Sequence, residues 1–449
     1  MLNTAFTNIF RDELPVYKLK KRLLHGREKS FLTTKDSSNK LKVSLLLLIA
    51  RIDKLSEKDQ ELTSYLWLSL SWKDDTLKWN PSSYGNITTF TTTHDTLWIP
   101  EMIIRNTKEQ PIDIGLEQKR RVRVFSDGSV SWSTAMIVRT HCDIDMTNFP
   151  WDVQVCHVEF STMTYQKDIQ YVPAYNEVSR QAFKKNPQWN LIKTKLRTYD
   201  MFIKIGDHNG TGTVAYATFI LARQSRYYTM IIVVPSFVII IVTGFTLLLP
   251  FKSGEKVSLN ITVLLSYTML LILMSSIMPE NSLNFPILAL HLVLNMIMSG
   301  IILISTVCHQ RLYFTSPDKP LPKMIDPIAL VYLSQIWNFV TCSKTKPPLN
   351  NMNSKVSSSL SVTDAVNEYE ENSAQDKSKN ENVEEEDAIQ LHEKKVQKGI
   401  SILENYYFVF YMLLFFIYIT VVFSNIARSP GAHGIDDKIH FSPAYDKEI

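Results

Sequence analysis

Four apolar segments, each long enough to cross a bilayer, constrain this chain more than any other feature of its sequence. They lie near Tyr228–Pro250, Val257–Met278, Pro286–Cys308 and Tyr406–Ile426. A membrane-spanning helix needs about 20 predominantly apolar residues, and each segment approaches that length. The residues before the first segment are much more polar. The sequence therefore predicts a polar half of the chain attached to four membrane helices.

The distribution of basic residues predicts the orientation of these helices. The flanking basic residues are Lys252, Lys256, His309, Arg311, Lys319, Lys323, Lys394, Lys395 and Lys398. The positive-inside rule places them in the cytoplasm. Both chain termini and the short link Pro279–Phe285 then face outward. The formal net charge of +4 is mild and no basic stripe stands out, so nucleic acid is not expected as a partner.

This topology predicts six regions along the chain. They are an N-terminal segment 1–40, an extracellular β-sandwich 41–224, transmembrane helices 1–3 in 225–308, a cytoplasmic loop 309–404, transmembrane helix 4 in 405–427 and an extracellular tail 428–449. Within the loop we expect an amphipathic helix 322–342, a disordered stretch 343–387 and a helix 388–404. Residues 1–51 contain no clear secretory signal, which favours a start that is incomplete or misassigned.

The polar half has the pattern of a β-sandwich. Leu41–Ile52 and Thr63–Trp72 are rich in β-branched, aromatic and other apolar residues. Lys119–Phe125 and Val130–Val138 flank a turn at Ser126–Ser129, which predicts a hairpin. Short strands separated by turns are typical of a sandwich. Glycosylation sequons begin at Asn86 and Asn209, in agreement with an extracellular location.

The chain has four cysteines, of which two lie in the polar half. If that half is extracellular, Cys142 and Cys156 are expected to form a disulfide, because that compartment is oxidising. Closing a loop of about 15 residues stabilises the fold by about 3 kcal/mol in the chain-entropy model. Cys308 and Cys342 are expected to be free thiols.

The second apolar segment differs from the others because it starts with Glu255 and Lys256 and carries polar residues at helical spacing. One face is predicted to contain Ser258, Thr262, Leu265, Met269, Ile272 and Ser276. In an oligomer a Leu265 ring would form a hydrophobic constriction, and a Glu255 ring would favour cations. A buried bundle helix whose hydroxyls bond to neighbouring helices fits the same spacing.

No catalytic constellation, metal-ligand spacing or glycine-rich phosphate loop stands out in the sequence. The four membrane segments argue against an enzyme. No cofactor and no metal site are expected.

Several motifs give a family resemblance. The segment from Cys142 to Cys156, with Phe149-Pro150-Trp151-Asp152 at its tip, resembles the signature loop of Cys-loop receptors. Trp98-Ile99-Pro100-Glu101 resembles that family's Trp-x-Pro-Asp motif. Leu249–Ser258 is similar to the inner mouth of serotonin type 3 receptor subunits, with the zinc-activated channel branch as a rival.

The resemblance implies a plasma-membrane receptor of postsynaptic type, built with four further subunits of the same or a related type around a pore. Its other partners would be a small extracellular agonist, bound between outer domains, monovalent cations and membrane lipids. Phe149, Pro150, Trp151 and Asp152 would meet the link that ends at Pro286 near the membrane surface.

Arg223 matches the family's arginine before the first membrane helix. It is expected to pair with Asp152 or another carboxylate in the region that couples agonist binding to gating. The alternative is a positive interfacial residue that anchors the helix.

The resemblance also implies cation selectivity, because Gly254-Glu255 stands where anion-selective relatives carry a Pro-Ala pair. Ser276 occupies a place where an acidic residue often lies. Any outer charge ring is therefore expected to be weaker or displaced toward Glu280, which argues against calcium permeation.

The agonist pocket departs most from the family pattern. Candidate pocket residues are Trp67, Arg105, Asn106, Met163, Trp189 and Tyr216. Trp67 and Trp189 match aromatic residues of the complementary face. On the principal face Met163 replaces an expected tryptophan, Tyr216 is displaced, and Arg105-Asn106 replaces a polar–acidic pair. Aromatic rings attract an ammonium ligand, whereas the charge of Arg105 would repel it.

We therefore predict a cation-channel subunit similar to serotonin type 3 receptors whose own principal face does not bind serotonin. Two alternatives stay open. One is an accessory or non-conducting subunit that needs a partner, and the other is a channel gated by zinc, protons or another ligand.

Overall fold

The structure is a computed structural model. It describes residues 14–27, 40–110, 114, 121–162, 169–205, 208–250, 254–279, 285–313, 399, 401–402, 404–421 and 424, with the backbone alone at 202–205, 208–211 and 312–313. The contacts divide it into two compact units. One contains the β-rich half with residues 273–288, and the other contains most of the helical residues.

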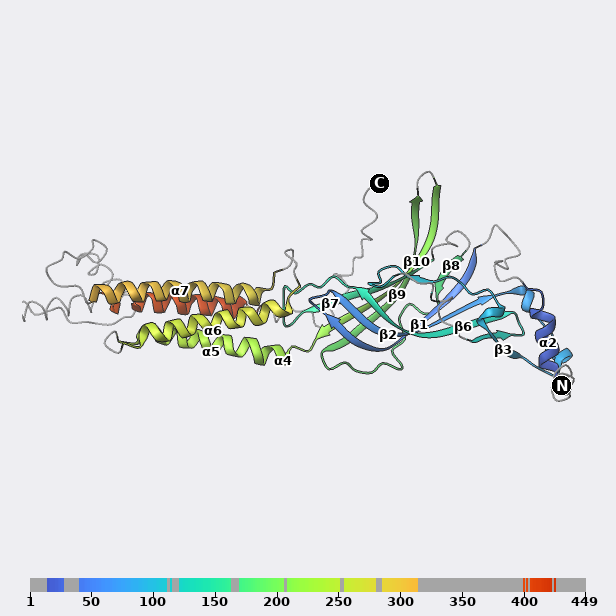
Figure 1. The fold of residues 1–449 in the computed structure, drawn as a ribbon, viewed down its shortest axis with the longest axis horizontal. Coiled ribbons are helices and arrows are strands. Elements are labelled where there is room, and N and C mark those ends of the chain that lie inside the picture. The colour runs from blue at the N-terminus through green and yellow to red at the C-terminus, as the bar shows by residue number, and fades with distance from the viewer. Residues whose placement is uncertain are drawn as a thin grey trace, which may run out of the picture. The chain divides into compact units, whose positions relative to one another are not determined.

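The β-rich unit is a sandwich of two sheets (Figure 1). The first has the order β3-β5-β6-β2-β1-β8. Its strands are β1 (Leu41–Ser56), β2 (Glu61–Lys73), β3 (Thr89–Thr93), β5 (Arg121–Phe125), β6 (Ser129–His141) and β8 (Ile169–Pro173). All neighbouring pairs are antiparallel except β1 and β8, which run parallel.

The second sheet has the order β4-β7-β10-β9. Its strands are β4 (Ile103–Ile104), β7 (Val153–Ser161), β9 (Trp189–Ile205) and β10 (His208–Arg223). Side chains of β2, β6 and β7 alternate between buried and exposed positions, as a strand with one face toward a core requires. The inward residues, including Leu66, Leu68, Trp132, Val158 and Phe219, form the core between the sheets.

Short helical elements complete this unit. They are helix α2 (Pro15–Leu24) and the 3₁₀ turns Asp75–Leu77, Pro81–Tyr84 and His94–Thr96. The expected β5–β6 hairpin turns through Gly128, whose φ of 84° is a conformation that glycine adopts without strain.

Four helices of the described residues are long and apolar enough to cross a membrane. The first is continuous over Arg226–Leu248 and comprises α4 (Arg226–Tyr228), a π-helical turn (Thr229–Val233) and α5 (Val234–Leu248). The others are α6 (Lys256–Ile277), α7 (Ile287–Tyr313) and a last helix, Glu404–Val421.

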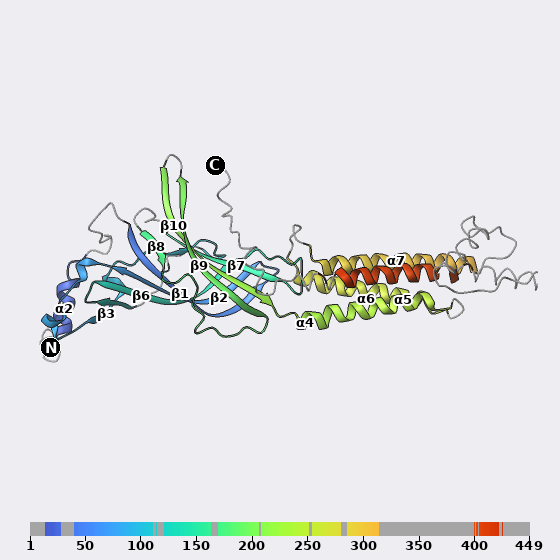
Figure 2. The ribbon, with the colours of Figure 1, turned by 180° about the vertical axis from the view of Figure 1, so that it is seen from behind.

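Within the helical unit the four helices lie side by side, as Figures 1 and 2 show. The last helix is drawn in red in both figures. Ile240 and Leu247 of α5 pack with Ile302 of α7 and Tyr411 of the last helix. Asn260 of α6 donates a hydrogen bond to Thr306 of α7 across 3.3 Å, which gives a buried amide a partner.

The predicted fold class, strands and four spanning segments are thus confirmed. Several predictions lie outside the described residues: the amphipathic helix 322–342, the disordered stretch 343–387, most of the helix 388–404, Cys342, and the tail 428–449. Cys308 is an exposed free thiol in α7. Asn86 is exposed, whereas the side chain of Asn209 is not described.

Candidate functional site

Helix α6 presents one exposed face, as its sequence spacing predicts. Leu265, Met269 and Ile272 are 57%, 60% and 64% exposed. Ser258, Thr262 and Ser276 are exposed on the same face. The face is apolar in its middle and carries hydroxyls at its two ends.

The opposite face of α6 is buried. It contains Asn260, Val263, Tyr267, Leu270 and Met274, all buried. The two faces differ because buried positions recur every three or four residues, which is the period of an α-helix. The predicted pore face is thus the exposed face of α6, while its role as a pore lining stays a prediction.

Arg223, at the end of β10, lies in a buried charged cluster. Its Nε donates to Asp152 Oδ1 at 2.6 Å and its Nη2 donates to Asp152 Oδ2 at 3.0 Å. Its Nη1 donates to Glu57, which follows β1. The Asp152 partner is confirmed, and Glu57 is a second carboxylate that the sequence did not indicate. Such bidentate pairs are the strongest charge-assisted hydrogen bonds.

Aromatic rings surround the Arg223 guanidinium. Its Cζ lies 4.3 Å from the ring centroid of Trp189, 5.0 Å from Phe149 and 5.3 Å from Tyr228. Burial by itself lowers the pKa of Arg223, but the hydrogen bonds and charges of Asp152 and Glu57 outweigh it and raise the pKa. The guanidinium therefore stays charged in a site from which water is largely excluded.

Asp152 has a further partner within the loop between the cysteines. Gln154 Nε2 donates to Asp152 Oδ2 at 2.5 Å and to the carbonyl of Asp145 at 2.8 Å, while its Oε1 accepts from the N–H of Asp145 at 3.0 Å. Gln154 thus holds the loop and the carboxylate in one arrangement.

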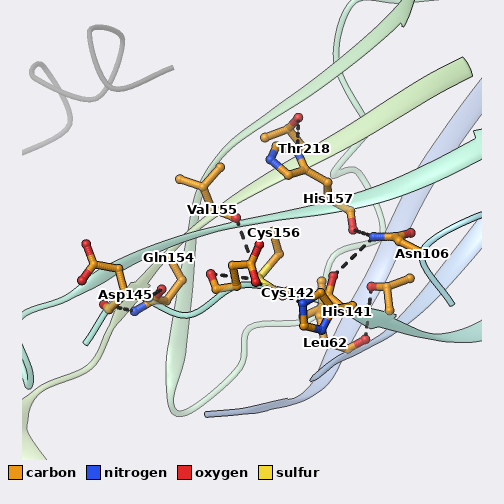
Figure 3. The surroundings of a disulfide bond; sticks show 12 residues. Leu62, Asn106, His141, Cys142, Asp145, Gln154, Val155, Cys156, His157 and Thr218 are labelled. Carbon is orange, nitrogen blue, oxygen red and sulfur yellow. Dashed lines mark hydrogen bonds and ion pairs between the residues drawn. A yellow bond between two sulfur atoms is a disulfide. The ribbon is translucent and has the colours of Figure 1, made fainter. Parts of the chain in front are cut away.

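The Cys142–Cys156 disulfide is present, with 5.1 Å between the Cα atoms, and Figure 3 shows its surroundings. Phe149 and Pro150, at the tip of the loop, are buried. The carbonyl of Thr147 accepts a hydrogen bond of 3.1 Å from the N–H of Ile287, the residue after Pro286. The loop between the cysteines therefore contacts the start of α7 through Thr147, while the contact of Phe149–Asp152 with the link that ends at Pro286 stays a prediction.

Trp67 lies on the outward face of the first sheet and is 49% exposed. It is paired with Ala135 of β6, next to the pair of Tyr65 and Ile137. Ile137 is also largely exposed. Trp67 and Ile137 therefore lie exposed on the same face of the first sheet.

On the second sheet, the candidate principal face is formed around Tyr216. Its ring centroid is 5.7 Å from that of Tyr199 in edge contact. Tyr216 is paired in register with Glu159 of β7. Burial raises the pKa of Glu159, and the charge of the nearby Arg105 opposes this shift. Arg105 is exposed and also contacts Met201 Sδ at 3.3 Å.

The structure changes the interpretation of Asn106. Its amide nitrogen donates to the carbonyls of His141 at 3.3 Å and His157 at 2.9 Å, as Figure 3 shows. Its oxygen accepts from the N–H of Glu159 at 3.1 Å. Since these backbone contacts occupy both ends of the amide, Asn106 joins strands and is a poor candidate for binding agonist.

The assignment of Trp189 to the agonist pocket is wrong. Trp189 is 1% exposed, lies opposite Arg223 in the β9–β10 register and stacks on its guanidinium. Trp189 is the first residue of β9, and the sequence around it does not distinguish a pocket tryptophan from one that contacts Arg223. Tyr199 and Glu159 were missed because strand pairing brings them to the site, and Glu57 was missed because only its ion pair with Arg223 brings it there. Met163 and Glu280 lie outside the described residues.

Two protein-family models together match most of the chain. Residues 16–225 match the family model of the neurotransmitter-gated ion-channel ligand binding domain. Residues 232–405 match that of the neurotransmitter-gated ion-channel transmembrane region.

Among curated proteins, the neuronal acetylcholine receptor subunit alpha-4 of Mus musculus is 30% identical over 305 residues, which are 67% of this chain and 47% of that protein. Subunit alpha-2 of Homo sapiens is 30% identical over 306 residues, 67% of this chain and 56% of that protein. The chain thus matches about half the length of these relatives.

Proposed function

Because this chain belongs to the neurotransmitter-gated ion-channel family, we propose that it is one subunit of a pentameric, agonist-gated cation channel whose pore is lined by α6. The chain is a membrane protein with a β-sandwich domain and four helices suited to spanning. Membership of a channel family also means that it is not an enzyme.

The exposed face of α6 is the observation that carries this proposal. In a ring of subunits, the hydroxyls of Ser258 and Thr262 would help to hydrate an ion near the inner end. The apolar side chains of Leu265, Met269 and Ile272 would narrow and dry the middle of the path. A hydrophobic constriction of this kind gates by losing its water.

Glu255 is proposed to set the selectivity for cations. It is exposed and immediately precedes α6, where its carboxylate would form part of a ring at the inner mouth. Such acidic rings attract cations and exclude anions.

Replacing Glu255 by alanine is expected to reduce selectivity, because the inner mouth loses its negative charge. The measurement is the reversal potential of the agonist-evoked current while external NaCl is diluted. The wild-type assembly should follow the sodium equilibrium potential, and Glu255→Ala should fall short of it. A variant that follows sodium as closely as the wild type would contradict the role of Glu255.

The agonist is proposed to bind where this subunit supplies the complementary face, through Trp67 on the outward face of β2. The other face is less suited to an amine because Arg105 is exposed beside Tyr216 and Glu159. The two relatives described above are acetylcholine receptor subunits, whereas the similarity to serotonin type 3 subunits depends on Leu249–Ser258. A partner subunit with an aromatic principal face would complete the pocket.

The subunit expressed alone is therefore expected to give no serotonin or acetylcholine current, and coexpression with a serotonin type 3 or nicotinic partner should produce one. Voltage-clamp recording across amines, zinc and pH checks this, with surface labelling to verify delivery to the membrane. Trp67→Ala should lower agonist sensitivity in the heteromer. A robust amine current from the homomer would contradict this assignment of the two faces.

The topology belongs to the same proposal. Both termini are proposed to be extracellular, and Asn86 and Asn209 are proposed as glycosylation sites. The exposed position of Asn86, after a turn at Gly85, supports its access to a glycosyltransferase.

A further inference from the structure

Lys256, the first residue of α6, lies behind the predicted pore face. It is 2% exposed, although it carries a charge and begins a helix next to the exposed Glu255. Its position follows from helical spacing, because Lys256, Asn260, Val263 and Tyr267 succeed one another on the buried face. From the sequence, Lys256 was interpreted as a charge flanking a membrane segment, and the structure shows that it is enclosed instead.

Three acceptors hold the Lys256 ammonium in place. Nζ donates to the carbonyls of Leu247 and Leu249, both at 3.2 Å, at the end of α5. These are carbonyls that the helix leaves without an intrahelical partner. Nζ also forms an ion pair with Glu404 Oε1, at the start of the last helix. Both side chains of this pair are largely buried, at 3% and 10% exposed.

Glu404 supplies the negative charge that makes this enclosure stable. Carbonyl oxygens alone do not neutralise an ammonium, and burying an unpaired charge is unfavourable, so the charge tends to move toward water. The lysine stem is long and flexible enough to carry the charge away from the bundle. The nearest position in the chain that is exposed to solvent is occupied by Glu255.

We propose that Glu404 is a selectivity-determining residue of the channel, which acts by holding the charge of Lys256 behind the pore helix and away from the Glu255 ring. Each copy of this subunit contributes one Glu255 and one Lys256, so a Lys256 released into the inner mouth would offset the negative charge that the same copy adds to the ring. This inference rests on the proposed function, because it assumes that α6 lines the pore.

The test is Glu404→Gln, which keeps the shape of the side chain and removes its charge. In the conducting assembly, we expect the reversal potential under NaCl dilution to shift away from the sodium equilibrium, and the single-channel conductance to fall by about twofold or more. Glu404→Asp, which retains a carboxylate, should stay close to the wild type. Lys256→Gln combined with Glu404→Gln should restore wild-type selectivity, since no lysine is left to enter the mouth.

Wild-type selectivity and conductance in Glu404→Gln would overturn the inference. So would a loss that persists in the double variant, because Glu404 would then act without Lys256. The Glu255→Ala measurement distinguishes a failure of the channel assignment from a failure of the role proposed for Glu404. If Glu255→Ala alters selectivity and Glu404→Gln does not, the channel assignment stands and the role of Glu404 fails.

If the Glu404→Gln variant does not reach the cell surface, a second variant tests the inference. The double variant Lys256→Glu with Glu404→Lys exchanges the two residues, so the ion pair is kept with its two charges exchanged. An enclosed pair predicts unchanged cation conductance for this exchange. A residue 256 that faced the pore would instead add a second acidic ring and raise cation conductance, which would overturn the inference.

Discussion

Replacement of Arg223 by glutamine is expected to abolish agonist-evoked current. Arg223 neutralises both Asp152 and Glu57 in a buried cluster, and glutamine would leave two carboxylates near each other without a cation. Removing one partner of a buried ion pair destabilises a protein by about 3–5 kcal/mol, which is a large share of the stability of a domain. The aromatic rings of Trp189 and Phe149 would also lose the cation that they contact.

Surface biotinylation together with voltage clamp separates the two ways in which the current can be lost. A folding defect lowers the amount of subunit at the surface, whereas a gating defect leaves the surface amount unchanged and removes the response. Arg226→Gln is the matched control, because Arg226 is exposed three residues later and should tolerate the same change. Arg223→Lys should be intermediate, since lysine lacks the fork that binds Asp152 through two nitrogens.

The cluster also provides a reason why gating should depend on it. Asp152 belongs to the loop between the cysteines, and Thr147 of the same loop accepts a hydrogen bond from Ile287 at the start of α7. Arg223 itself lies three residues before the first membrane helix. An Arg223→Gln assembly with normal surface expression and a normal agonist response would show that this cluster does not take part in gating.

Replacement of Leu265 by threonine is expected to produce spontaneous opening and higher agonist sensitivity. Leu265 is the first of the exposed apolar residues in the middle of the predicted pore face, and it is followed by Met269 and Ile272. A hydroxyl in each subunit would make the closed constriction easier to wet. A bias of about 1.4 kcal/mol in the closed–open equilibrium of the assembly corresponds to a tenfold change.

The measurements are the holding current without agonist, identified by a pore blocker, and the agonist concentration that gives a half-maximal response. Leu264→Thr is the matched control because it makes the same change at a half-buried position, about 100° around the helix. Similar effects at both positions would indicate a general loosening of α6. If Leu265→Thr behaves as the wild type in an assembly that contains this subunit, Leu265 does not form the constriction.

Local patterns in the sequence were sufficient to predict the β-sandwich and the four membrane-spanning helices. Lengths of apolar sequence located four spanning helices, and runs rich in β-branched, aromatic and other apolar residues, separated by turns, located strands such as β2 and β6. The exposed face of α6 followed from a helical period, which depends only on residues near one another in the chain. The disulfide between Cys142 and Cys156 joins residues 14 positions apart and was also predicted.

Partners of single side chains were decided by the tertiary structure. Trp189 was placed in the agonist pocket and instead stacks on Arg223, because the β9–β10 register brings the two residues opposite each other. Asn106 was predicted to line the pocket, and its amide joins strands through backbone contacts. A local sequence pattern does not show which strand lies next to a given residue in the fold.

The Lys256–Glu404 pair is the clearest case, because 148 positions of the chain separate its members. The sequence by itself determined that Lys256 lies at the start of the second membrane segment, and it placed Glu404 at the end of the cytoplasmic loop, just before the last membrane helix. Only the tertiary structure decided that the two charges neutralise each other inside the bundle. Charges far apart in the sequence find their partners through the packing of the helices that carry them, and that packing depends on the whole hydrophobic core.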